Sequence, residues 1–159
     1  SGATQFGAQV GYKGQYLNFI YGAVSAASAF TEDPVTTTDA LFIDYTGGFD
    51  LSDSFFVGIN AAYAYSDEEE AGYQGAALYL ENTFSETFAL GLRPEFFSYT
   101  SADDSEDVLA LTLAASTQLD DNLKLITELR YDSSDDYKIE GIAAEKNATA
   151  LTIAAVYSF

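Results

Sequence analysis

The residues with the greatest capacity for chemistry are charged side chains spaced two apart around positions 93 and 130. Consecutive side chains of an extended strand point to opposite faces, so Arg93 and Glu95 share one face, as do Arg130 and Asp132. Two interpretations stay open: the charges line a constriction and set ion selectivity, or they form a salt-bridge ladder that fills a narrow interior. The polar residues that we assign to this face are Asp44, Asn60, Glu81, Arg93, Glu95, Lys124, Glu128, Arg130 and Asp132.

A separate acidic run offers hard oxygen ligands of the kind that calcium prefers. It consists of Asp103, Asp104, Glu106 and Asp107. Its spacing matches no defined calcium loop, and runs of like charge are usually solvated. We therefore favour a solvated surface over a metal site and expect no cofactor.

Catalysis has little support in the composition. The chain has no histidine and no cysteine, which removes the commonest general base, the thiol nucleophile and the disulfide. Carboxylates are plentiful, but nothing singles out one pair for acid–base work. We expect a protein that is not an enzyme.

The overall composition combines strong acidity with abundant apolar residues. The formal net charge is −19, yet hydrophobic residues make up 48% of the chain, with 12 Tyr and 12 Phe. A disordered acidic chain would be poor in aromatic residues, so this chain is expected to fold. Its negative charge opposes binding to nucleic acid.

Apolar residues recur mostly at every second position, which is typical of β-strands. No apolar run approaches the ~20 residues that a membrane-spanning helix needs. Most predicted strands have a length close to the ~9–11 residues of a tilted transmembrane strand. The predicted strands cover residues 4–12, 16–27, 39–50, 55–66, 73–83, 88–99, 108–118, 123–132 and 149–159.

Short polar turns and long acidic connections alternate strictly along the chain. Leu51–Phe55, Phe84–Phe88 and Leu119–Leu123 each place three small or polar turn formers between large apolar residues. All short turns therefore lie at one end of the strands and all long connections at the other. This is the pattern of an up-and-down antiparallel meander.

The two faces of most predicted strands differ sharply in character. One face carries large apolar residues, such as Leu109, Leu111 and Leu113, and the other carries small and charged ones. Unpaired charge is expensive in a dry core, whereas a wet or salt-bridged lumen accommodates it. We therefore expect the apolar face to meet lipid and assign the nine polar residues above to the lumen. The faces of strand 16–27 do not separate by sequence.

The final segment, residues 149–159, alternates up to a terminal aromatic residue. It resembles the closing strand of bacterial outer-membrane β-barrels. That resemblance implies that Tyr157 and Phe159 form part of the signal that the barrel-assembly machinery recognises.

Two further phrases, Gly91–Ser98 (GLRPEFFS) and Glu128–Asp132 (ELRYD), resemble the OmpL-like β-barrel porins of Gram-negative bacteria, and the similarity spans most of residues 39–159. It implies an outer-membrane barrel with porin-like or structural duties and no established catalytic residues. Such porins look about twice as long as this chain, which resembles their C-terminal part.

We thus predict an all-β, antiparallel up-and-down transmembrane β-barrel, with residues 1–159 as a single barrel domain. Bacterial single-chain barrels have even strand numbers, so eight strands are preferred, with residues 1–14 as an extra strand or N-terminal segment. Alternatively, the chain is part of a larger barrel. Eight strands favour the salt-bridge ladder, because such a barrel is filled by its own side chains; a larger or multi-chain barrel favours the constriction.

The predicted function is passive diffusion of small solutes or cations across the bacterial outer membrane. The expected partners are the lipid bilayer, the barrel-assembly machinery, the transported solutes and, in an oligomer, further copies of the chain. Two alternatives remain. One is a closed small barrel with an anchoring or loop-display role, and the other is a secreted acidic β-protein that assembles through its edge strands.

Overall fold

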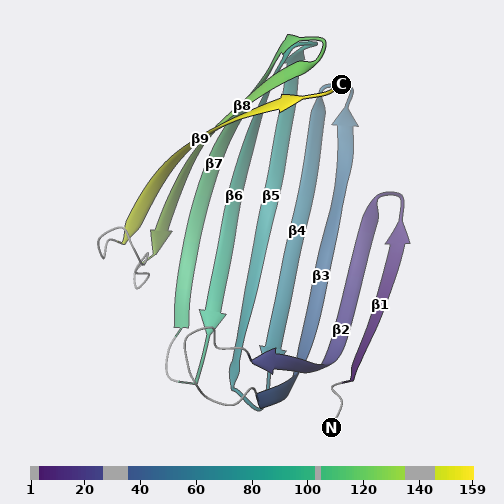
Figure 1. The fold of residues 1–159 in the computed structure, drawn as a ribbon, viewed down its shortest axis with the longest axis vertical. Helices are drawn as coiled ribbons and strands as arrows, with labels where there is room; N and C mark the ends of the chain where they lie inside the picture. The colour runs from purple at the N-terminus through teal and green to yellow at the C-terminus, as the bar shows by residue number, and fades with distance from the viewer. Residues whose placement is uncertain (1–3, 27–35, 103–104, 135–145) are drawn as a thin grey trace.

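In the part of the chain that the structure describes, nine long strands form a single sheet (Figure 1). The computed structural model describes residues 4–26, 36–102, 105–134 and 146–159. The strands are β1 (Gln5–Tyr12), β2 (Gln15–Ala26), β3 (Thr36–Ser52), β4 (Phe55–Ser66), β5 (Ala71–Ser85), β6 (Phe88–Thr100), β7 (Ser105–Asp120), β8 (Leu123–Ser134) and β9 (Asn147–Tyr157).

Each strand pairs antiparallel with its neighbours in the sequence, which confirms the predicted up-and-down topology. β1 and β9 lie at opposite edges, and the sheet is not closed within the described residues (Figure 1). β1 pairs with β2 from Gln5 to Tyr12, so the described residues form nine strands rather than the preferred eight. The first segment is a strand because Lys13 and Gly14, both at positive φ, make a two-residue hairpin turn.

The three remaining short turns share one construction, as their common sequence template predicts. Each is preceded by a register shift, between Asp50 and Ser52, Thr83 and Ser85, and Gln118 and Asp120. In the last turn, Asp120 Oδ1 accepts hydrogen bonds from the backbone N–H groups of Asn122 (2.8 Å) and Leu123 (2.9 Å). Such bulges re-aim the strand that carries them.

The two faces of the sheet are sorted as predicted. In β7, Leu109, Leu111 and Leu113 are 62%, 47% and 48% exposed, whereas the intervening Ala110 and Thr112 are 8% and 2% exposed. Small side chains are therefore packed together on one face, and large apolar ones splay apart on the other. This is the arrangement expected for the concave and convex faces of a curved sheet, and we use these names below.

β2 has a definite orientation, although its sequence does not separate the faces. Asn18 bonds to the concave-face residues Gln9 and Asp44, so Tyr16 and Ile20 also belong to the concave face. No helix within the described part of the chain is long and apolar enough to cross a membrane.

Candidate functional site

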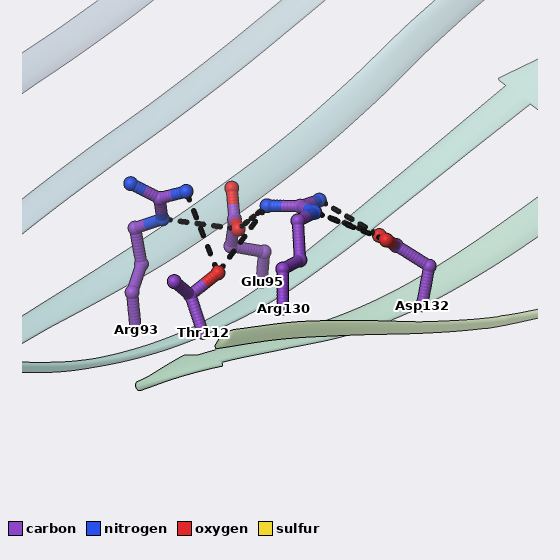
Figure 2. Close-up of polar contacts among 5 residues, drawn as sticks. All are labelled: Arg93, Glu95, Thr112, Arg130 and Asp132. Carbon is purple, nitrogen blue, oxygen red and sulfur yellow. Dashed lines mark hydrogen bonds and ion pairs between the residues drawn. The ribbon is translucent and has the colours of Figure 1, made fainter. Parts of the chain in front are cut away.

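Five polar side chains on the concave face converge near the middle of the three adjacent strands β6, β7 and β8. Figure 2 shows the contacts among them. Register explains the convergence: Arg93, Thr112 and Arg130 lie opposite one another on β6, β7 and β8. One row away, Glu95 and Asp132 flank Ala110. We call Arg93, Glu95, Thr112, Arg130 and Asp132 the charge network.

Ion pairs join these side chains into one unit. Arg93 Nε lies 3.0 Å from Glu95 Oε2, and the same carboxylate oxygen accepts a hydrogen bond from Arg130 Nη1. Arg130 also donates to Asp132, with Nη2 at 2.8 Å and Nε at 3.0 Å from Oδ1. The four charged side chains are 20–34% exposed. Two guanidinium groups and two carboxylates thus neutralise each other in a partly hydrated setting.

A second row of polar side chains crosses the concave face from β1 to β4. Gln9 Nε2 donates to Asn18 Oδ1 at 2.7 Å, and Asn18 Nδ2 donates to Asp44 Oδ1 at 2.6 Å. Asn60 Nδ2 lies 3.2 Å from Asp44 Oδ2 and 2.9 Å from Thr46 Oγ1. Asp44 therefore receives amide N–H donors from both sides, and no cation pairs with it within the described residues.

The remaining candidate residues lie on the same face, closer to the short turns. Glu81 and Glu128 line a hollow of about 210 Å³ with Arg93 and Thr112. Lys124 lies beyond it and, with Glu81, lines a hollow of about 170 Å³ at the turn end. The structure thus brings four of the nine candidates into the charge network, joins Asp44 to Asn60, and leaves Lys124 apart from the network.

The acidic run gains no support as a metal site. Asp103 and Asp104 lie outside the described residues, and Glu106 and Asp107 lie at the start of β7. Among the residues that the structure describes, no group of three or more acidic, histidine or cysteine side chains could hold a metal ion.

Sequence reasoning missed several contributors to these clusters. Thr112 accepts from both guanidinium groups at 3.5 Å, and the Tyr79 ring lies under Arg93, with its centroid 5.6 Å from Cζ. Tyr73 and Phe97 form a stacked ring pair on the concave face, with centroids 5.9 Å apart. The alternation of side chains along each strand could have placed all of them on this face, but the predicted site was built mainly from charged residues.

A family model described as "Putative beta-barrel porin-2, OmpL-like" matches residues 1–159. The chain belongs to this family of OmpL-like β-barrel porins. The predicted class is therefore confirmed: this is a porin-like β-barrel protein of the bacterial outer membrane. Membership of a porin family points to a channel rather than an enzyme.

Solved structures support the same fold at low sequence identity. In-vitro folded OmpT, an outer membrane protein of Vibrio cholerae, aligns with a TM-score of 0.62 and 12% identity, over 98% of this chain and 55% of that one. The NanC porin aligns with a TM-score of 0.59 and 11% identity, over 98% and 73%. The OmpL-like chain thus spans about half the length of OmpT. Comparison with curated proteins gives no match.

Proposed function

We propose that the concave face is the wall of an aqueous lumen through which small neutral or cationic solutes diffuse passively. The observation that supports this is the distribution of charge. All basic residues of the described strands, Arg93, Lys124 and Arg130, lie on the concave face. The convex face presents exposed leucines, such as Leu109 and Leu111, instead. A face with hydrated ions suits water, and a face of exposed leucines suits lipid.

We propose that the lumen prefers cations, because carboxylates without an ion-pair partner outnumber basic side chains without one on this wall. The charge network is neutral within itself, so it contributes little net field. Asp44, Glu81 and Glu128 have no ion-pair partner among the described residues and outnumber Lys124. Fixed negative charge on a confined wall enriches cations and does so less at high ionic strength.

Conductance in planar bilayers tests this proposal. We expect single-channel steps and, in a salt gradient, a reversal potential of the sign set by cation flow. Absence of steps at any voltage would contradict the pore and favour a plugged barrel with an anchoring role. A reversal potential of the opposite sign would contradict the cation preference only.

Replacing both Glu81 and Glu128 with glutamine should lower the cation-to-anion permeability ratio at least twofold. The change removes two unpaired carboxylates from one hollow and alters the side-chain volumes little. Replacing the exposed turn residues Asp53 and Asp121 with asparagine is the control, because it also removes two carboxylates and neither residue lines this hollow or the hollow at the turn end. A ratio that falls equally in both proteins would indicate general surface charge rather than lumen charge.

We further propose that Tyr157 and Phe159 form the assembly signal. Tyr157 ends β9 opposite Leu123, whereas Phe159 lies past the strand and is fully exposed. Replacing Phe159 with alanine should therefore reduce the amount assembled in the outer membrane several-fold, while folding into detergent in vitro stays unchanged. The two yields, measured by heat-modifiable gel mobility, check this. If the yields in the outer membrane and in detergent fell equally, Phe159 would have a structural role and not a role as an assembly signal.

We also propose that residues 1–159 form a single β-barrel domain. Assembly into a homo-oligomer is a further proposal; OmpT of Vibrio cholerae is described in a trimer form.

A further inference from the structure

A hollow on the concave face lies beside the charge network, on the side of the long connections. Its volume is about 190 Å³, and its lining includes residues of β4 to β8. The floor is made of small residues, among them Ala62, Gly75 and Ala110. Glu95 and Arg130 border it on one side, and the Tyr73–Phe97 ring pair on the other.

The small residues of the floor leave room for the Phe97 ring. Gly75 lies opposite Phe97 in the register of β5 and β6. A Cβ at position 75 would lie 3.4 Å from Phe97 Cδ2 and 3.1 Å from the Phe96 carbonyl oxygen. Glycine thus lets the Phe97 ring lie close over the neighbouring strand. Tyr73 and Phe97 remain 38% and 44% exposed, so both rings are open to the space above the face.

The polar side of the hollow offers hydrogen-bonding groups without net charge. Within the described residues, every contact of the Glu95 carboxylate is made by Oε2, which leaves Oε1 as an available acceptor (Figure 2). Asn60 adds an amide to the lining. Because two guanidinium groups balance Glu95 and Asp132, a cation gains no net attraction here.

We infer that this hollow is a weak binding site for one pyranose unit of a neutral sugar, and we call it the sugar subsite. A pyranose has an apolar C–H face, which suits an exposed ring, and hydroxyl groups, which suit a carboxylate oxygen and an amide. The volume is below the ~300–1,000 Å³ of sites for drug-sized ligands, which fits a single sugar ring. This inference rests on the proposed function, because a dissolved sugar reaches the hollow only if the concave face is in contact with water.

Saturation-transfer NMR on the folded protein tests the subsite without depending on conduction. The protein is held in a detergent that has no sugar headgroup, and glucose is titrated. We expect transfer to the C–H protons of glucose and saturation in roughly the millimolar range. Phe97→Leu and Tyr73→Leu should each weaken binding at least fivefold.

Phe42→Leu is the matched control, because Phe42 lies on the concave face, paired with Ala64, and outside the hollow. It should leave glucose binding unchanged. Phe97→Tyr keeps an aromatic ring and should retain glucose binding. If Phe97→Leu does not fold, Tyr73→Leu and Phe97→Tyr still test the role of the ring pair. Ethylammonium, a small cation, should not displace glucose.

Three results would overturn the sugar subsite: glucose transfer that never saturates, equal losses in Phe97→Leu and Phe42→Leu, or displacement of glucose by ethylammonium. Failure of the proposed function is distinct, because it shows as absence of single-channel conductance whatever the binding result. A protein that conducts but does not bind glucose keeps the pore and loses the subsite.

Discussion

Replacing Leu113 with lysine is expected to destabilise the membrane-inserted protein by about 2–4 kcal/mol, the cost of a basic side chain on the lipid face near the midplane. Leu113 is 48% exposed and lies mid-strand on the convex face of β7. Its neighbours opposite, Leu92 and Leu129, are also exposed and apolar, so the ammonium group would find no carboxylate nearby. Urea unfolding from lipid vesicles measures the loss.

Replacing the adjacent Ala114 with lysine provides the control. Ala114 faces the hollow that contains Glu81 and Glu128, and Glu128 lies directly opposite it on β8. The added charge would meet carboxylates and water, so we expect a change within about 1 kcal/mol. A larger loss for Ala114→Lys than for Leu113→Lys would reverse the assignment of the two faces.

Replacing Arg130 with methionine is expected to cause the second large loss of stability. Arg130 joins Glu95 to Asp132. Methionine keeps much of the apolar stem, so the change mainly removes charge-assisted hydrogen bonds. Because the Arg130 side chain is 34% exposed, we place the cost near the lower end of the range for hydrogen bonds to charged groups, about 1.5–2 kcal/mol. The same unfolding assay applies.

Lys124→Met is the matched variant, on the same strand and the same face. Lys124 is exposed and has no ion pair within the described residues, so its loss should cost little. Adding Glu95→Gln to Arg130→Met should cost less than the sum of the two single changes, because the pair is coupled. Strict additivity, or a Lys124→Met loss as large as that of Arg130→Met, would contradict the network.

The fold followed from the sequence because strand parity and turn chemistry are local signals. Leu51–Phe55, Phe84–Phe88 and Leu119–Leu123 fixed three hairpins, and alternation within each strand sorted its side chains onto faces. For the first segment, two signals disagreed: its alternation predicted a strand, whereas the even-number rule argued against counting Gln5–Tyr12 as a strand of the barrel. Its pairing with β2 along its full length decides the matter.

The charge network was only partly predictable, because its geometry depends on cross-strand register. Glu95 and Arg130 meet across β7, and the register shift between Gln118 and Asp120 sets the pairing of β7 with β8. Without that bulge, Thr112 would lie opposite Tyr131, and the charged face of β8 would join the leucine face of β7. Sequence parity within one strand cannot reveal such a shift.

The part of the polar row formed by Gln9 and Asn18 was missed for a related reason. Asn18 lies on a strand whose own sequence does not separate the faces, and Gln9 lies within residues 1–14, which the even-number rule set apart as an extra strand or N-terminal segment. Gln9 donates to Asn18, and Asp44, the acceptor for Asn18, lies 26 residues beyond it in the sequence. Only the pairing of three strands shows that these side chains form one hydrogen-bonded row.

Probe accessibility at adjacent positions tests the central claim most directly, namely that the concave face meets water and the convex face meets lipid. The chain has no cysteine, so Glu128→Cys and Leu129→Cys give single labelling sites on opposite faces of β8. In vesicles, a fluorophore at 129 should be quenched by nitroxide-labelled lipid tails, and one at 128 by aqueous iodide. Lipid quenching at 128 together with iodide quenching at 129 would contradict the account.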